Sequence, residues 1–243
     1  MQPDWQKFLL THRPPVMASH AAAGGIILTD LSHAGLIRVE GNDAVPFLQG
    51  QLSTDIEKLT PDVCQLSSWN NAKGRVVTLL HLFRLDDAIY MALPTAFAAP
   101  VLKRLSMYVL RSKVNLTDAT DTLARFGLAG PGADELLAEA GIDVPMAVYG
   151  ITQRRGVQAI RLHGAAPRYT IKAHVDTLMG LWEKLETRGV RPADNDAWAL
   201  AKILAGEPSV FPETSEHFVA QMLDLDKLGA VDFKKGCYIG QEV

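Results

Sequence analysis

The segment between residues 64 and 94, CQLSSWNNAKGRVVTLLHLFRLDDAIYMALP, constrains the fold more than any other part of the chain. β-Branched and aromatic residues fill three runs, which two short polar segments separate: Asn71-Ala72-Lys73-Gly74 and Asp86-Asp87. Residues of these types form tight turns, and turns this short join antiparallel neighbours. The segment therefore predicts a three-stranded antiparallel meander.

The rest of the chain alternates single helices with hairpins and short strands. The pattern predicts a strand, a turn and a helix over residues 35–59, a helix over 95–110, a strand and a helix over 122–141, a hairpin over 156–174, and helices over 175–189 and 194–206. Hairpins interspersed with single helices are typical of an α+β protein with antiparallel sheets, and they argue against a doubly wound parallel sheet.

Composition excludes several classes of protein. The 243 residues carry a net charge of −3, which gives no general attraction to nucleic acid or to a membrane surface. Two distant cysteines and no CxxC fit a reducing cytoplasm, and seven histidines without metal-ligand spacing make a metal site unexpected. The first 25 residues have an acid and an aromatic where a signal peptide has its basic region, so they predict a mobile arm.

Several chemical motifs have simpler explanations. The Gly130-Pro131-Gly132 turn precedes a predicted helix, where backbone N–H groups can bind phosphate, but a tight turn is the commoner role. No GxSxG supports a serine nucleophile, and the pairs Asp86/Asp87 and Asp224/Asp226 lie in turn-like contexts. A tryptophan on a helix such as Trp198 more often packs in a core than binds a ligand.

Cys237 is the strongest chemical candidate, because two lysines and two glycines surround it. Lys234 and Lys235 would favour a thiolate electrostatically if they lie close to it in space. Gly236 and Gly240 would let other groups approach the backbone. The alternative is a buried cysteine that packs as a small apolar side chain beside solvated lysines, and chemistry alone leaves both interpretations open.

The segment FKKGCYIGQEV, residues 233–243, resembles the K-G-C-[FY]-x-G-Q-E motif of the YgfZ-type folate-binding proteins. That family is related in fold to the glycine-cleavage T-protein, a folate-dependent aminomethyltransferase. The resemblance extends upstream through GNDAVPFLQGQLSTDI, NNAKGRVV, GPGA and WALAKILAGEP, in the family's order. Around Cys237 and Lys235, it assigns supporting positions in the motif to Gly236, Tyr238, Gly240, Gln241 and Glu242.

The resemblance implies two interlocked α+β lobes, each discontinuous in sequence, around a central hole that holds tetrahydrofolate. We expect residues 1–50 and 121–195 to form the first lobe, and residues 51–120 and 196–243 to form the second lobe with KGCYIGQE. In the family a C-terminal β-barrel follows a segment that ends in Arg-Gly, and the sequence up to Val243 contains neither. The expected fold is therefore T-protein-like without the usual barrel.

The resemblance also implies roles for single residues near the folate. Trp198 matches a tryptophan of the family's pocket, which makes it a candidate stacking surface for a tetrahydrofolate cofactor. Thr78 and Leu79 stand where the T-protein has an aspartate pair, so aminomethyl transfer by that mechanism is not expected. Leu204 replaces the family's glutamate that faces the pterin, and Glu207 is not expected to take over that position.

The function implied by the resemblance is that of a folate-binding helper in iron–sulfur cluster assembly or repair, which supports iron–sulfur-dependent tRNA modification. The expected partners are reduced folate and iron–sulfur enzymes or assembly proteins, with no direct nucleic-acid contact and no membrane. Cys237 would act as a nucleophile, a transient cluster ligand or a redox sensor, since a cluster normally takes four protein ligands. The alternatives are a folate-dependent one-carbon transferase and an interaction scaffold without folate binding.

Overall fold

Two compact units, each assembled from two separate stretches of chain, make up the protein. The computed structural model describes residues 3–12, 25–32 and 34–241. Unit 1 consists of Met1–His33 and Asp121–Glu207, and unit 2 consists of Ala34–Thr120 and Pro208–Val243. Among the residues described, no helix is both long enough and apolar enough to cross a membrane.

The unit boundaries differ from the expected ones at two places. The expected first lobe includes residues 34–50, but strand β2 (Ala34–Glu40) pairs with β5 (Ala88–Pro94), so this stretch belongs to unit 2. The expected second lobe includes helix α6 (Asn195–Leu204), but this helix packs against strands β1 and β7 of unit 1. Backbone pairing and helix packing, which the sequence pattern does not reveal, place both segments.

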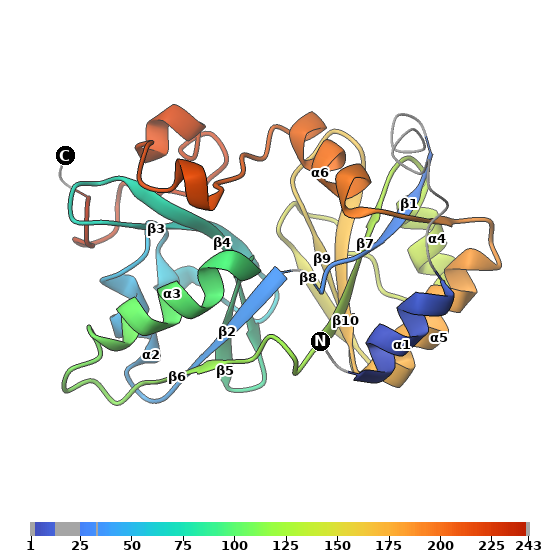
Figure 1. The fold of residues 1–243 in the computed structure, drawn as a ribbon, viewed down its shortest axis with the longest axis horizontal. Coiled ribbons are helices and arrows are strands. Elements are labelled where there is room, and N and C mark those ends of the chain that lie inside the picture. The colour runs from blue at the N-terminus through green and yellow to red at the C-terminus, as the bar shows by residue number, and fades with distance from the viewer. Residues whose placement is uncertain (1–2, 13–24, 33, 242–243) are drawn as a thin grey trace. The chain divides into compact units, whose positions relative to one another are not determined.

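Unit 1 is built on a six-stranded sheet with the order β11-β1-β7-β10-β9-β8. Figure 1 labels β1, β7, β10, β9 and β8 of this sheet. Neighbouring strands of this sheet are antiparallel, except that β1 runs parallel to β11. Every residue of β7 is buried, including the charged Arg125. The strands are β1 (Ile27–Asp30), β7 (Ala124–Ala129), β8 (Ile151–Arg154), β9 (Val157–Arg161), β10 (Arg168–Ala173) and β11 (Arg191–Ala193).

Unit 1 also contains helices α1 (Pro3–Thr11), α4 (Ala133–Ala140), α5 (Val175–Glu186) and α6. The prediction of a mobile N-terminal arm is wrong for α1, because Trp5 is fully buried and packs edge-on against Trp182. The Trp5 indole also donates a hydrogen bond to Asp30 Oδ1 at 2.9 Å. Burial of two large aromatic side chains stabilises a segment whose composition alone suggested disorder.

Unit 2 is built on a five-stranded antiparallel sheet with the order β3-β4-β5-β2-β6. The predicted meander is confirmed as β3 (Gln65–Asn70), β4 (Val76–Leu85) and β5, and β6 spans Asn115–Asp118. Among the described residues of this unit, the helices are α2 (Ala44–Gln49), α3 (Thr95–Ser106) and the short 3-10 helices η2 (Ile56–Lys58), η3 (Pro212–Thr214) and η4 (Ala220–Leu223). The two antiparallel-rich sheets with their helices confirm the α+β class.

Candidate functional site

The cysteine segment, which we define as residues 232–241, lies in unit 2 against the turn between β3 and β4. In that turn the N–H of Gly74 donates to Asn71 O at 3.0 Å. Gly240 has a φ of +79°, and a Cβ at this position would overlap the carbonyl oxygen of Asn71. Two sequence motifs that are far apart in the chain, NNAKG and GCYIGQ, therefore meet at a contact that requires glycine.

Lys235 anchors the cysteine segment to the helical region that follows β2. Its side chain is only 8% exposed, and Nζ donates hydrogen bonds to the carbonyl oxygens of Gln49, Leu52 and Thr54 at 2.7–2.8 Å. We call this arrangement the carbonyl cage. Burial lowers the pKa of Lys235 to about 8, while the carboxylates of Asp55 and Asp232 favour the charged form.

The carbonyl cage changes the role that the sequence suggested for Lys235. An ammonium group has three donors, and the cage accepts all three, so none remains to bond the thiol of Cys237. Lys235 is therefore a residue that positions the segment. Lys234 is exposed, and its backbone N–H donates to Asp232 Oδ1 at 2.8 Å.

The two cysteines differ in their surroundings. Cys237 is exposed, whereas Cys64 is buried next to the start of β3. Gly236, directly before Cys237, has open space where a Cβ would lie, so the backbone beside the thiol is accessible. The alternative of a buried, packed cysteine is wrong for Cys237 and fits Cys64.

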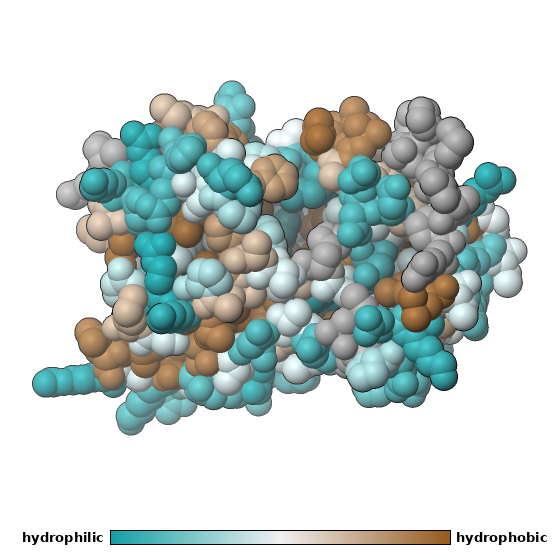
Figure 2. Space-filling model, in the orientation of Figure 1, coloured by the Kyte–Doolittle hydropathy of each residue, from teal (hydrophilic) through white to brown (hydrophobic). Residues whose placement is uncertain are grey.

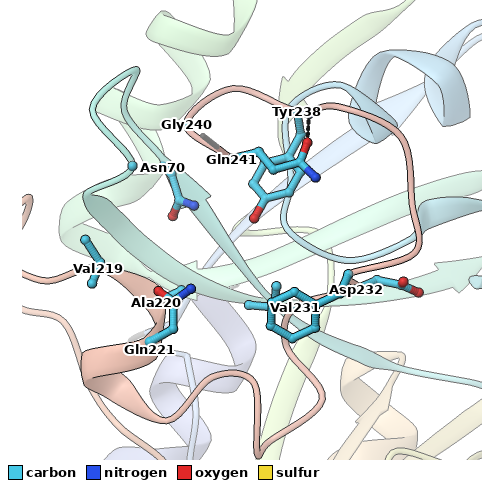
Figure 3. Close-up of a pocket in the computed structure, with 11 residues that line it drawn as sticks. Asn70, Val219, Ala220, Gln221, Val231, Asp232, Tyr238, Gly240 and Gln241 are labelled. Carbon is cyan, nitrogen blue, oxygen red and sulfur yellow. Dashed lines mark hydrogen bonds between the residues drawn. The ribbon is translucent and has the colours of Figure 1, made fainter. Parts of the chain in front are cut away.

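A pocket of about 320 Å³ opens beside the cysteine segment (Figure 3). Tyr238, Gly240 and Gln241 line one side of it, and Gln241 Oε1 accepts a hydrogen bond from the N–H of Tyr238 at 3.3 Å. Burial raises the pKa of the Tyr238 phenol. Glu242, the last residue of the motif, lies outside the described residues. The other lining residues are Asn70, Gly74, Val219, Ala220, Gln221, Val231, Asp232 and Phe233.

The remaining candidates lie in unit 1. Trp198 is 6% exposed, and a Cβ on Gly127 of β7 would overlap its ring, so the tryptophan packs tightly on the sheet. The Arg168 guanidinium lies 5.4 Å from the centre of the Trp198 ring and forms an ion pair with Glu207. Both charged residues are buried, and Lys202 Nζ lies 3.4 Å from the other oxygen of Glu207.

Leu204, by contrast, is 66% exposed and lines a second pocket of about 220 Å³ in unit 1. The Gly130-Pro131 turn, the loop from Gly164 to Pro167 and Arg168 form other parts of its wall. Together with Ile203, which is 72% exposed, Leu204 contributes to the hydrophobic surface visible over α6 (Figure 2). The pocket thus combines an apolar rim with a buried arginine.

Comparison with known proteins identifies the family. The model of the GCVT N-terminal domain matches residues 15–164. The tRNA-modifying protein YgfZ of Yersinia pseudotuberculosis is 30% identical over 234 residues, which are 96% of this chain and 70% of that protein. The chain is a YgfZ-type member of the GCVT family. The YgfZ protein of Colwellia psychrerythraea is 31% identical over 88% of this chain and 65% of its own length.

The GCVT family membership agrees with the fold. The glycine cleavage system aminomethyltransferase T from Bartonella henselae superposes with a TM-score of 0.65 at 21% identity, covering 82% of this chain and 53% of that one. This chain spans 65% and 70% of the lengths of the two YgfZ relatives. The expected resemblance to YgfZ-type proteins and to the T-protein fold is confirmed.

Three features of the site in this YgfZ-type chain could not be predicted from the sequence. The carbonyl cage depends on backbone carbonyls 181–186 residues away from Lys235. The Arg168–Glu207 ion pair joins strand β10 to the segment that follows α6, and no spacing rule predicts it. Asn70 stands in the recognised NNAKG motif, but its place in a pocket wall follows only from the fold of the second stretch of unit 2.

Proposed function

We propose that the protein is a cytoplasmic folate-binding helper that supports iron–sulfur cluster assembly or repair, and thereby iron–sulfur-dependent tRNA modification. The observation that carries the proposal is the exposed Cys237 on a segment that the carbonyl cage and Gly240 hold in place. The naming of the relatives as tRNA-modifying proteins supports it. The proposed partners are iron–sulfur enzymes or assembly proteins and reduced folate, with no direct contact to nucleic acid or membrane.

Folate binding is the second part of the proposal. The unit 1 pocket supports it, because Leu204 stands where the family has its pterin-facing glutamate and lines that pocket. The residues would hold the pterin by apolar contact, since Leu204 offers no carboxylate. Trp198 is too buried to offer a full ring face, so we propose that it supports the pocket from behind.

The one-carbon transferase alternative receives no support from the residues present. Thr78 is fully buried in β4, its hydroxyl bonds to the carbonyl oxygen of Leu79, and Leu79 is 8% exposed. Neither side chain carries a carboxylate that could orient the nitrogen chemistry of a folate. We therefore favour the helper function over aminomethyl transfer.

Replacing Cys237 by serine tests the role of the thiol. We expect Cys237→Ser to leave the unfolding temperature unchanged, because the side chain is exposed, and to abolish support of iron–sulfur-dependent tRNA modification. The measurement is mass spectrometry of modified tRNA nucleosides from cells that depend on this protein. Cys64→Ala is the matched control, and it should retain the modifications as long as it folds. Full modification with Cys237→Ser would reduce the cysteine to a surface residue.

Introducing the missing carboxylate tests the folate pocket. We expect Leu204→Glu to bind tetrahydrofolate at least about tenfold more tightly in calorimetry, because a carboxylate facing a pterin makes two charge-assisted hydrogen bonds. The fold should tolerate the change, since Leu204 is 66% exposed. Ile203→Glu adds the same charge next to it, on a residue that does not line the pocket. Equal affinity of the two variants would contradict a pterin at this position.

A further inference from the structure

The pocket beside the cysteine segment has a polar wall that the proposed function does not use. Asn70 is 3% exposed, lines the pocket, and its carboxamide oxygen has no hydrogen-bond partner among the described residues. Figure 3 shows the Asn70 carboxamide and the Tyr238 hydroxyl directed into the same space. A buried amide without a partner costs free energy, and a ligand that pairs with it recovers that cost. At about 320 Å³, the pocket lies at the lower end of the range for small-molecule sites.

The pocket wall presents no unpaired charge among the residues described. Asp232 is its one acidic residue, and its carboxylate is directed away from the pocket in Figure 3 and lies 2.5 Å from Lys58 Nζ. The Lys58 ammonium and the N–H of Lys234 hold the pKa of Asp232 below its usual value, so the carboxylate stays charged and paired. The described lining contains no lysine or arginine. An anionic ligand such as a phosphate or carboxylate would therefore lose its water without gaining a cation.

Carboxamide and aromatic groups define the chemistry that fits. An asparagine carboxamide offers a donor beside an acceptor, and it pairs edge-on with a planar ring that presents the complementary groups. Gln221 and Gln241 add two more carboxamides, and Tyr238 and Phe233 supply aromatic surface. We propose that this pocket binds a neutral planar heterocycle with a lactam edge, a carbonyl next to an N–H, held by Asn70 and Tyr238.

Pterins and nucleobases share this lactam edge, and a binding experiment can distinguish between these two classes of ligand. Ligand-observed NMR on the full chain would compare pterin, uracil and orotate, which is uracil carrying a carboxylate. Ligands of this size are expected to bind with a Kd on the order of 1 mM. We expect pterin or uracil to bind and orotate to bind at least about tenfold more weakly. The tighter of the two neutral probes indicates which source the pocket prefers.

Variants assign the binding to this pocket. Asn70→Ala should weaken binding of the neutral probe about tenfold, and Tyr238→Phe, which removes one hydroxyl and keeps the ring, about three- to tenfold. Asn115→Ala and Tyr108→Phe change the same residue types elsewhere in unit 2 and should have no effect. If Asn70→Ala does not fold, Tyr238→Phe alone decides. The proposal would be overturned if neither pterin nor uracil binds at about 10 mM, or if orotate binds as tightly as the neutral probes. Wild-type affinity of Tyr238→Phe for the neutral probe would also overturn it.

Discussion

Replacing Arg168 by methionine is expected to lower the free energy of unfolding by about 3–5 kcal/mol. Arg168 is 2% exposed and Glu207 is 4% exposed, and their ion pair lies against the Trp198 ring. Removing the arginine leaves the Glu207 carboxylate buried without this ion pair, and Lys202 Nζ lies 3.4 Å from its other oxygen. A buried carboxylate that loses its main partner costs more than the pair itself contributes. Urea denaturation of the full chain measures the loss.

Two further variants separate the buried charge from simple loss of packing. The double variant Arg168→Met, Glu207→Met removes both charges and should recover most of the lost stability, because apolar replacement of a buried pair is often neutral. Arg154→Met alters an exposed arginine on β8, whose ion pair with Asp143 spans 3.0 Å, and should cost under about 1 kcal/mol. A loss for Arg168→Met no larger than for Arg154→Met would contradict the buried-pair interpretation.

The second large effect is expected for Lys235→Met, which should destabilise unit 2 by about 2–4 kcal/mol. The methionine fills a similar volume but donates nothing to the carbonyl oxygens of Gln49, Leu52 and Thr54. Their desolvation is then uncompensated, and the cysteine segment loses its anchor. Chemical denaturation gives the stability, and the rate of limited proteolysis within residues 232–241 reports the loosening of the segment.

Lys234→Met provides a matched control for Lys235→Met, since the neighbouring lysine has the same chemistry but is exposed. We expect Lys234→Met to stay within about 0.5 kcal/mol of the wild type and to leave proteolysis unchanged. If both variants behave alike, the carbonyl cage does not anchor the segment. A selective effect of Lys235→Met would separate the positioning role of this lysine from any electrostatic effect on the thiol.

Local patterns predicted the local structure well. The meander over residues 64–94 followed from three apolar runs and two polar turns, and α6 begins where the sequence suggested, with Asp194 accepting a hydrogen bond from Ala197 N at 2.9 Å. The helix after Gly41 is shorter than predicted. It ends at Gln49, and Ile56, which has helical spacing to Leu48, lies in a 3-10 helix. Periodicity marks the buried face there, but it does not fix the backbone between the buried residues.

The functional groups were only partly predictable, because their environment depends on distant backbone. The sequence indicated Cys237, Lys235 and Gly240, and the structure separates them into an exposed thiol, an internal anchor and a close backbone contact. The proximity of Lys235 to Cys237 in sequence suggested an electrostatic role, but proximity does not say where an ammonium points. The direction of the Lys235 ammonium is set by the backbone carbonyls of Gln49, Leu52 and Thr54, far upstream in the sequence.

The separation between Lys235 and its carbonyl partners also has a consequence for synthesis of the chain. Thr54 and Lys235 are 181 residues apart, so a ribosome that adds roughly 5–20 residues per second would reach Lys235 about 10–40 s after it adds Thr54. The carbonyl cage can form only after that interval. Between these times the sheet of unit 2 can form while the three carbonyls face water. A nascent chain would therefore present its thiol in a defined position only after both stretches of unit 2 have been translated, which ties any chemistry at Cys237 to completion of this unit.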